Sequence, residues 1–344
     1  MTSLLLPLRR LIVANPMIHK ELRGRMRGGR SFVILTVYLG LMALFSVLFY
    51  AVLNPDRNQY NYGSGNQDAG RNLLSAMVVF ETIMVVFLAP AFTAGVISGE
   101  RERQTFDLLM TTMLKPRSIV LGKMGAALAY LLLLILAVLP LESLAFMIGG
   151  VAPEEIWVPL VVLFCAALLY GSVGIFWSSL MRSTVAATVL TYGTVILVSA
   201  GLPFLWVMVS IFASANGNSQ AMTQNVPYIY FSGIVLSSNP VLAMGISETL
   251  VRVGKPLFFY METTAAPGTS FPVVQPWLVF CLMAVLFSLF FLAVSIRMLP
   301  PVRPGRRRVV PVPPAPAPVY GSLPPLPPAP PPGPPASPAD EESG

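Results

Sequence analysis

The sequence has few charged residues, one histidine and two cysteines. Among its 344 residues, 11% are Asp, Glu, Lys or Arg, whereas an average soluble domain carries about 25%. Cys165 and Cys281 both lie inside apolar runs, which argues against a disulfide framework and favours a role as small core residues. His19 has no second imidazole or thiol nearby. We therefore expect no metal site.

A phosphate-binding loop is also missing. The motif G-x-x-x-x-G-K-[ST] does not occur, because Met124 follows Gly122-Lys123 and Pro256 follows Gly254-Lys255. We expect the chain not to be an enzyme and to bind no cofactor itself. The basic residues fall between apolar runs instead of forming one face, so the net charge of +7 does not indicate nucleic acid.

Long apolar runs dominate what remains, at 55% hydrophobic residues and a mean hydropathy of +0.72. A helix needs about 20 apolar residues to cross a bilayer. The sequence predicts an all-α polytopic membrane protein with about six spans, near residues 31–53, 73–97, 119–148, 157–180, 185–213 and 276–298. Residues 31–298 form this transmembrane domain, residues 1–30 a cytoplasmic arm, and residues 299–344 a proline-rich tail predicted to be disordered.

The placement of Lys and Arg predicts the orientation. They concentrate before the first span, between the second and third, between the fourth and fifth, and after the last. Cytoplasmic loops carry this excess, so both termini are predicted to be cytoplasmic, in the plasma membrane. On the outer side, Asn239-Pro240 predicts a helix start and Arg252 lies near the predicted end. We interpret this stretch as part of a re-entrant or interfacial helix pair.

The loop between the second and third spans is the most informative segment. It begins with Glu100-Arg101-Glu102-Arg103 and then places Phe106, Leu109, Met110 and Met113 at helical spacing. This spacing gives a short helix one apolar face, which has to be covered by the membrane surface or by a partner protein.

This loop resembles that of ABC-2-type permeases. The resemblance covers about 25 residues, from Gly99 through Thr105, Leu108-Leu109 and Thr112 to Ile119–Lys123, with Gln104 as a mild departure. It implies a coupling helix that contacts a separate ABC ATPase subunit, which would bind ATP and Mg. The residues it assigns to coupling are Glu100, Arg101, Glu102, Arg103, Thr105, Leu109 and Thr112. We expect substitution of Glu102 or Arg103 to uncouple ATP hydrolysis from transport and to leave the fold intact.

The N-terminal arm is a basic segment with an apolar stripe, which is typical of an interfacial helix. Its start is marked by Asn15-Pro16, and Lys20, Glu21 and Arg23 follow. The resemblance implies that this helix braces the coupling helix and the ATPase. A simple lipid anchor is the alternative. The resemblance also implies that Asn239 and Pro240 belong to an outer gate.

Glu81 and Glu142 are ionisable residues within the predicted spans. An unpaired carboxylate in hydrocarbon is costly, so each is expected to face the bundle interior. Both lie toward the outer ends of their helices and could meet on one outward-facing cavity as a translocation path. Structural hydrogen bonding is the competing interpretation.

The sequence therefore favours the permease subunit of an ABC-2-type exporter, paired with a second copy or a paralogue. Two other functions stay open. One is an ion-coupled secondary transporter using Glu81 and Glu142, although no inverted repeat is visible. The other is a membrane scaffold that transports nothing. The substrate is not indicated.

Overall fold

The computed structural model describes residues 29–53, 67–106, 116–149, 151, 154–215, 225–263, 270–299 and 328–329, together with Glu21 and Gly24. Its contacts divide the chain into two units, Met1–Val302 and Arg303–Gly344. All elements discussed below belong to the first unit. Most of the arm and of the proline-rich tail lie outside the described residues.

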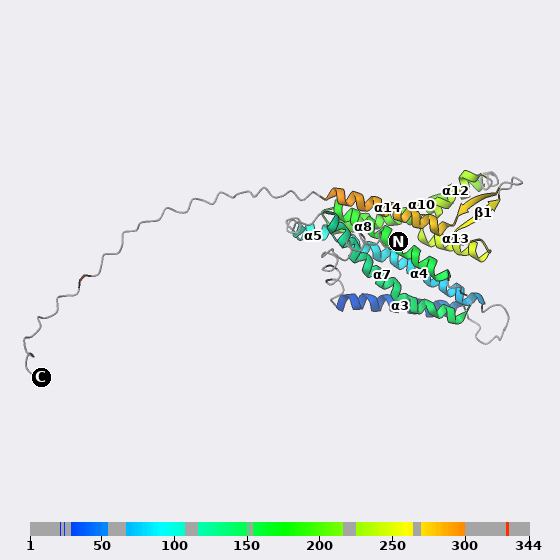
Figure 1. Ribbon diagram of the computed structural model, residues 1–344, viewed down its shortest axis with the longest axis horizontal. Coiled ribbons are helices and arrows are strands. Elements are labelled where there is room, and N and C mark those ends of the chain that lie inside the picture. The colour runs from blue at the N-terminus through cyan, green and yellow to red at the C-terminus, as the bar shows by residue number, and fades with distance from the viewer. Residues whose placement is uncertain are drawn as a thin grey trace, which may run out of the picture. The chain divides into compact units, whose positions relative to one another are not determined.

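Six helical segments in the described part of the chain are long and apolar enough to cross a membrane, which confirms the predicted all-α polytopic fold. They are α3 (Gly29–Leu53), α4 (Gln67–Thr93), α7 (Pro116–Ile148), α8 (Glu154–Leu180), the continuous run α9–η1–α10 (Thr184–Ala215) and α14 (Pro276–Met298). Figure 1 shows the short helix α5 (Ser98–Glu102) at one end of this bundle and α13 (Pro240–Arg252) with strand β1 (Phe259–Thr263) at the other.

Helix α8 is the centre of the bundle. Its apolar stretch is 67% buried, compared with 17% for α3 and 17% for α9–η1–α10. Close approach to α4 depends on Gly174, because a methyl group there would collide with the side chain of Thr93 and the backbone nitrogen of Ala94. Helices α3 and α9–η1–α10 therefore present most of their apolar surface to lipid or to another protein.

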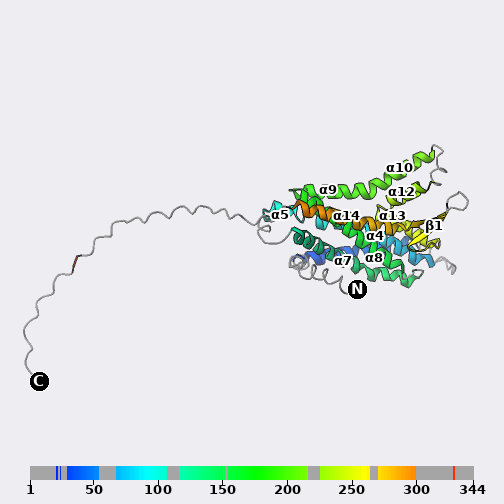
Figure 2. The ribbon, with the colours of Figure 1, turned by 45° about the horizontal axis from the view of Figure 1, so that its top comes forward.

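The fifth span contains a π-helical turn, η1 (Leu197–Gly201), before α10 (Leu202–Ala215). Pro203 has no backbone N–H and cannot bond to the carbonyl of Ser199 one turn earlier. Asn239 replaces it, since its Nδ2 donates to the Ser199 carbonyl oxygen at 2.7 Å. Figure 2 shows α9 (Thr184–Ile196) and α10 along one edge of the bundle.

The segment before the last span folds into α12 (Val226–Leu236), α13 and a hairpin of β1 with β2 (Ser270–Val274). The strands are antiparallel and pair Phe259 with Val274. Helix α13 occupies the range that the capping pattern of Asn239-Pro240 predicts. The hairpin is a small departure from the all-α prediction. Its sequence signal is weak, because Pro272 lies within β2 and proline is depleted in strands.

Candidate functional site

Helix α4 is followed by hydrogen-bonded turns that lead into α5, and we call residues 94–106, which include α5, the elbow. Its start is fixed to α8: the hydroxyl oxygen of Ser178 accepts hydrogen bonds from the backbone N–H groups of Ile97, at 2.8 Å, and Ser98, at 3.0 Å. Ser178 is fully buried. The first N–H groups of a helix lack acceptors within the helix, so this side chain stabilises the start of α5.

Arg101 joins the elbow to the end of α8. Its Nη1 donates to the carbonyl oxygen of Met181 at 3.3 Å, and its guanidinium lies 5.0 Å from the centre of the Phe106 ring. A cation at this position satisfies a carbonyl that the helix end leaves without a partner. Burial, and then the neighbouring charge of Arg182, lower the pKa of Arg101.

Glu102 joins the elbow to the fifth span. Its carboxylate accepts two hydrogen bonds from Thr184, one from the backbone N–H at 2.8 Å and one from the hydroxyl at 2.8 Å. Thr184 is the first residue of α9, and Ser183 at the N-cap makes no capping hydrogen bond with its own side chain. Glu102 thus caps α9 from another element. These hydrogen bonds lower the pKa of Glu102.

Lys123, on α7, connects the elbow to the N-terminal arm. Its Nζ lies 2.6 Å from Oε1 of Glu100 and 3.1 Å from Oε1 of Glu21. The lysine side chain is only 3% exposed, whereas the two carboxylates are 26% and 24% exposed. One buried cation therefore holds together three segments that are distant in the sequence: the arm, the elbow and the third span.

The outer part of the elbow is exposed. Arg103, Gln104 and Thr105 are all open to solvent. Gln104 has a positive φ of 59°, the left-handed region that β-branched residues avoid. Thr105 closes the turn, because its backbone N–H donates to the Glu100 carbonyl at 3.0 Å. These three residues form a polar surface beside the network of Arg101, Glu102 and Lys123.

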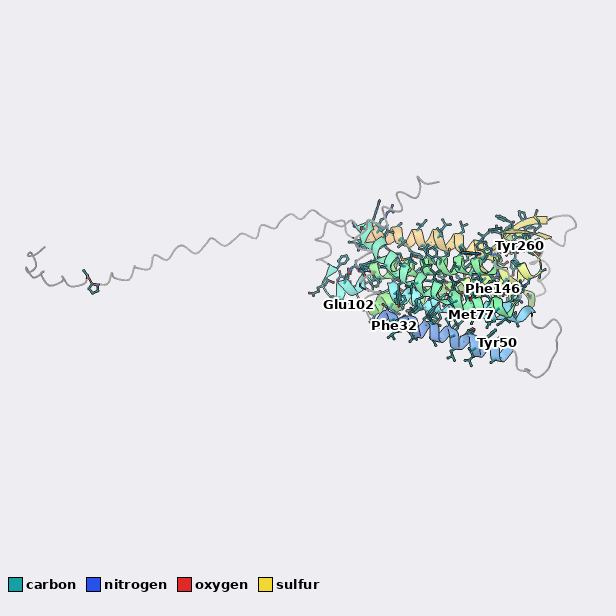
Figure 3. All side chains as sticks on the ribbon, turned by 60° about the horizontal axis from the view of Figure 1, so that its bottom comes forward. Phe32, Tyr50, Met77, Glu102, Phe146 and Tyr260 are labelled. Carbon is teal, nitrogen blue, oxygen red and sulfur yellow. The ribbon has the colours of Figure 1, made fainter. Side chains whose placement is uncertain are left out.

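The opposite end of the bundle is organised by Asn239. Its Oδ1 accepts from the backbone N–H groups of Val241, at 2.8 Å, and Leu242, at 3.3 Å, which caps α13. Because its Nδ2 bonds to Ser199, the same side chain fixes the start of α13 to the π turn of the fifth span. Figure 3 shows Glu102 and Tyr260 at opposite ends of the bundle, so the elbow and the hairpin lie far apart.

A cavity of about 240 Å³ lies at the end of the bundle near α13. Its walls come from α4, α8, α13, α14 and Leu257. They are mostly apolar, with polar groups from Arg71, Ser75, Ser247 and Glu248. Glu248 accepts hydrogen bonds from Ser75 and, at 2.6 Å, from Arg252. A pocket with apolar walls and a few polar groups suits an amphiphilic ligand.

Comparison with known protein families gives one match. The model of the ABC-2 family transporter protein matches residues 16–232, which is more than half of the chain. The chain belongs to the ABC-2 transporter family. The match begins at Pro16 in the arm and includes the elbow and the first five spans of this ABC-2 permease. No curated protein matches the chain.

The structure of this ABC-2 permease brings several of the predicted site residues together. Glu100 and Glu21 meet at Lys123, and Arg101 and Glu102 each contact the start of the fifth span or the turn before it. Arg103 and Thr105 lie on the exposed part of the elbow. The remaining predicted residues of the coupling helix and the arm lie outside the described residues: Leu109, Thr112, Pro16, Lys20 and Arg23.

Glu81 and Glu142 also meet in this permease, outside the lining of the cavity. Their carboxyl groups lie next to each other and the two residues are 1% and 4% exposed. Neither lines the cavity near α13. The pair lies where α3, α4 and α7 contact one another, among the buried residues that include Tyr38 and Met77. Their assignment to a translocation path therefore stays a prediction.

Sequence reasoning missed three features of the site. In the sequence, Lys123 counts as a basic residue near a span and as the end of the stretch that resembles other permeases, without a partner; its position among the apolar residues Ile119, Val120 and Met124 is a signal that it needs one. Thr184 gave no signal, because its acceptor is 82 residues away. Ser178 likewise acts on a segment 80 residues away.

Proposed function

We propose that this permease is the membrane subunit of an exporter and that a separate ATPase chain docks on the elbow. The observation that carries the proposal is the set of contacts made by the elbow. Through Arg101, Glu102 and Glu100 it is bonded to the end of α8, the start of α9 and Lys123 on α7. A force applied to Arg103, Gln104 and Thr105 on its exposed side would reach three spans directly.

The fifth span is the element that such a force would move. Glu102 accepts two hydrogen bonds from Thr184, the first residue of this span. The span is also among the least buried of the bundle. Its π turn lies farther along and is fixed to α13 by Asn239. π-helical turns occur often at functional positions. Displacement of the start of α9 would thus be transmitted to the end of the bundle that holds the cavity.

We propose that transport is directed outward. The elbow end carries Arg101, Arg103 and Lys123 and is assigned to the cytoplasm by the excess of basic residues there. The cavity, at the other end, would then face outward and release an amphiphilic substrate. ATP and Mg would be bound by the partner chain. A second copy or a paralogue would cover part of α3 and α9–η1–α10, the two spans that are least buried.

The proposal is tested by affinity purification of the chain from its native membranes in a mild detergent, followed by mass spectrometry and an ATPase assay. We expect an ABC ATPase to co-purify and to be lost from the Arg103→Glu variant. The side chain of Arg103 is exposed and makes none of the described hydrogen bonds, and its backbone N–H donates to the Gly99 carbonyl, so this change leaves the hydrogen bonds of the elbow in place. The matched control is Lys255→Glu, at the opposite end, which should retain the ATPase.

A purified chain without any ATPase, and an eluate that hydrolyses no ATP, would overturn the proposal in favour of an ion-coupled transporter. If the ATPase co-purifies but the complex of ATPase and permease moves no amphiphile in reconstituted vesicles, the chain is better described as a membrane scaffold.

A further inference from the structure

Three titratable side chains that belong neither to the elbow nor to the lining of the cavity meet inside the bundle. Tyr38 on α3 donates a hydrogen bond to Oε1 of Glu81 on α4, at 3.3 Å. The carboxyl group of Glu81 lies next to that of Glu142, on α7. All three are buried, at 3%, 1% and 4% exposure. The group therefore links the three helices α3, α4 and α7 at one point.

The surroundings of this group are apolar. The buried cluster in which Tyr38 lies consists of Met42, Leu73, Met77, Tyr130, Leu134 and Val138. Tyr130, the other titratable residue there, donates its hydrogen bond to the Ser31 carbonyl at 3.1 Å instead. Among the described residues, the groups in electrostatic contact with Glu81 are Tyr38 and Glu142, and none of the described ion pairs includes either carboxyl group.

Two adjacent carboxyl groups can form a hydrogen bond only if one of them carries a proton. An ionised carboxylate only accepts hydrogen bonds, so two carboxylates have no donor between them. Two like charges in contact in an apolar interior, with no cation beside them, are also strongly unfavourable. One proton removes both difficulties, since the protonated carboxyl group donates to the other.

A second observation supports a neutral carboxyl group at Glu142. Its Oε1 is buried and has no hydrogen-bond partner among the described residues. An unsatisfied oxygen is much less costly on a neutral acid than on a carboxylate, because burying an unpaired charge carries the larger desolvation cost. Glu81, by contrast, also receives the hydrogen bond from Tyr38.

We infer that Tyr38, Glu81 and Glu142 form a binding site for a single proton, which holds α3 against α4 and α7. The ligand is a proton shared by two carboxyl groups, with Tyr38 as a fixed second donor. Because the proton belongs to the pair, loss of it leaves two negative charges in contact and weakens the junction of the three helices.

The test is thermal unfolding of the full chain in detergent, measured from neutral to alkaline pH. Wild-type protein should lose stability as the pH rises and the shared proton leaves. Glu142→Gln keeps the shape and offers an amide donor to Glu81, so its unfolding midpoint should change much less over the same range. The control is Glu262→Gln, on the exposed hairpin, which should follow the wild type and accounts for the titration of other tyrosines and lysines.

Infrared spectroscopy of wild-type protein at neutral pH gives an independent readout that needs no variant to fold. The carbonyl band of a protonated carboxylic acid should be present in the wild type and absent from the Glu81→Gln/Glu142→Gln double variant. A wild type without this band, or a Glu142→Gln variant whose stability falls with pH as steeply as that of the wild type, would overturn the inference.

Discussion

Replacement of Lys123 by Met tests whether the arm, the elbow and the third span are held together by one buried cation. Methionine retains the apolar stem of the side chain and removes the charge. The carboxylate oxygens of Glu100 and Glu21 lie 2.6 and 3.1 Å from Nζ. They are therefore within about 6 Å of each other, and without the lysine they face each other with like charges.

The magnitude follows from the distances and the exposure. Two like charges about 6 Å apart repel by about 3 kcal/mol at an effective dielectric constant of about 20. Loss of one partner of a buried ion pair costs about 3–5 kcal/mol, whereas exposed pairs contribute about 0–1 kcal/mol. The lysine is buried but both carboxylates are about one quarter exposed. We therefore expect Lys123→Met to lower the free energy of unfolding by about 2–3 kcal/mol.

The assay is equilibrium unfolding in mixed micelles, followed by tryptophan fluorescence, for the single variants Lys123→Met and Glu100→Gln and for the double variant. The double variant should be more stable than the sum of the single losses predicts, by at least about 1 kcal/mol, because it lacks the repulsion. Lys255→Met is the control: its Nζ lies 3.9 Å from Glu262 and its side chain is 36% exposed, so its loss should stay below about 1 kcal/mol. Equal losses for Lys123→Met and Lys255→Met would refute the reasoning.

Three other predictions concern single side chains. Asn239→Asp keeps the oxygen that caps α13 but turns the donor to the Ser199 carbonyl into an acceptor. We expect the free energy of unfolding to fall by about 1–3 kcal/mol in the same assay. A loss no larger than that caused by the same substitution at an exposed Asn would contradict the account of the π turn. Gln104→Gly should be neutral or stabilising and Gln104→Val should cost about 1–2 kcal/mol, because the backbone is left-handed there; equal stability of the two variants would argue against that conformation. The hydrogen bonds from Thr184 lower the pKa of Glu102, so the stability that this cap contributes is present above the unfolded-state pKa and is lost as the pH falls through the folded-state pKa. Hydrogen exchange in the first turn of α9 should therefore quicken at acidic pH in the wild type but not in Glu102→Gln. An identical pH profile of the two proteins would count against the cap.

The spans were predictable because hydrophobic length is a local property of the sequence. The described residues contain six long apolar helices, the number that the apolar runs predict. The start of α13 was equally accessible, since Asn239 and Pro240 are adjacent capping signals. The hairpin of β1 and β2 could not be predicted from the sequence, because Pro272 interrupts the strand pattern of β2.

The contacts of the site depend on tertiary packing and so were only partly predictable. Glu102 was assigned to the ATPase surface by resemblance, whereas the structure gives its carboxylate a partner within the chain, Thr184. Substitution of Glu102 therefore also removes a helix cap, and Arg103 is the cleaner position for testing the partner. The burial of Glu81 was expected from the cost of a charge in hydrocarbon, but its contact with Glu142, 61 positions away in the sequence, depends on how α4 packs against α7.

Site-specific photo-crosslinking is the most direct test of the central claim that the ATPase docks on the elbow. A photoreactive amino acid would be placed at Arg103, on the exposed elbow, and in a second variant at Tyr260, on the hairpin at the opposite end of the bundle (Figure 3). We predict that illumination of native membranes links an ABC ATPase to the chain from position 103 and not from position 260. A crosslink to the ATPase from position 260 alone, or from neither position while the two proteins still co-purify, would contradict the account.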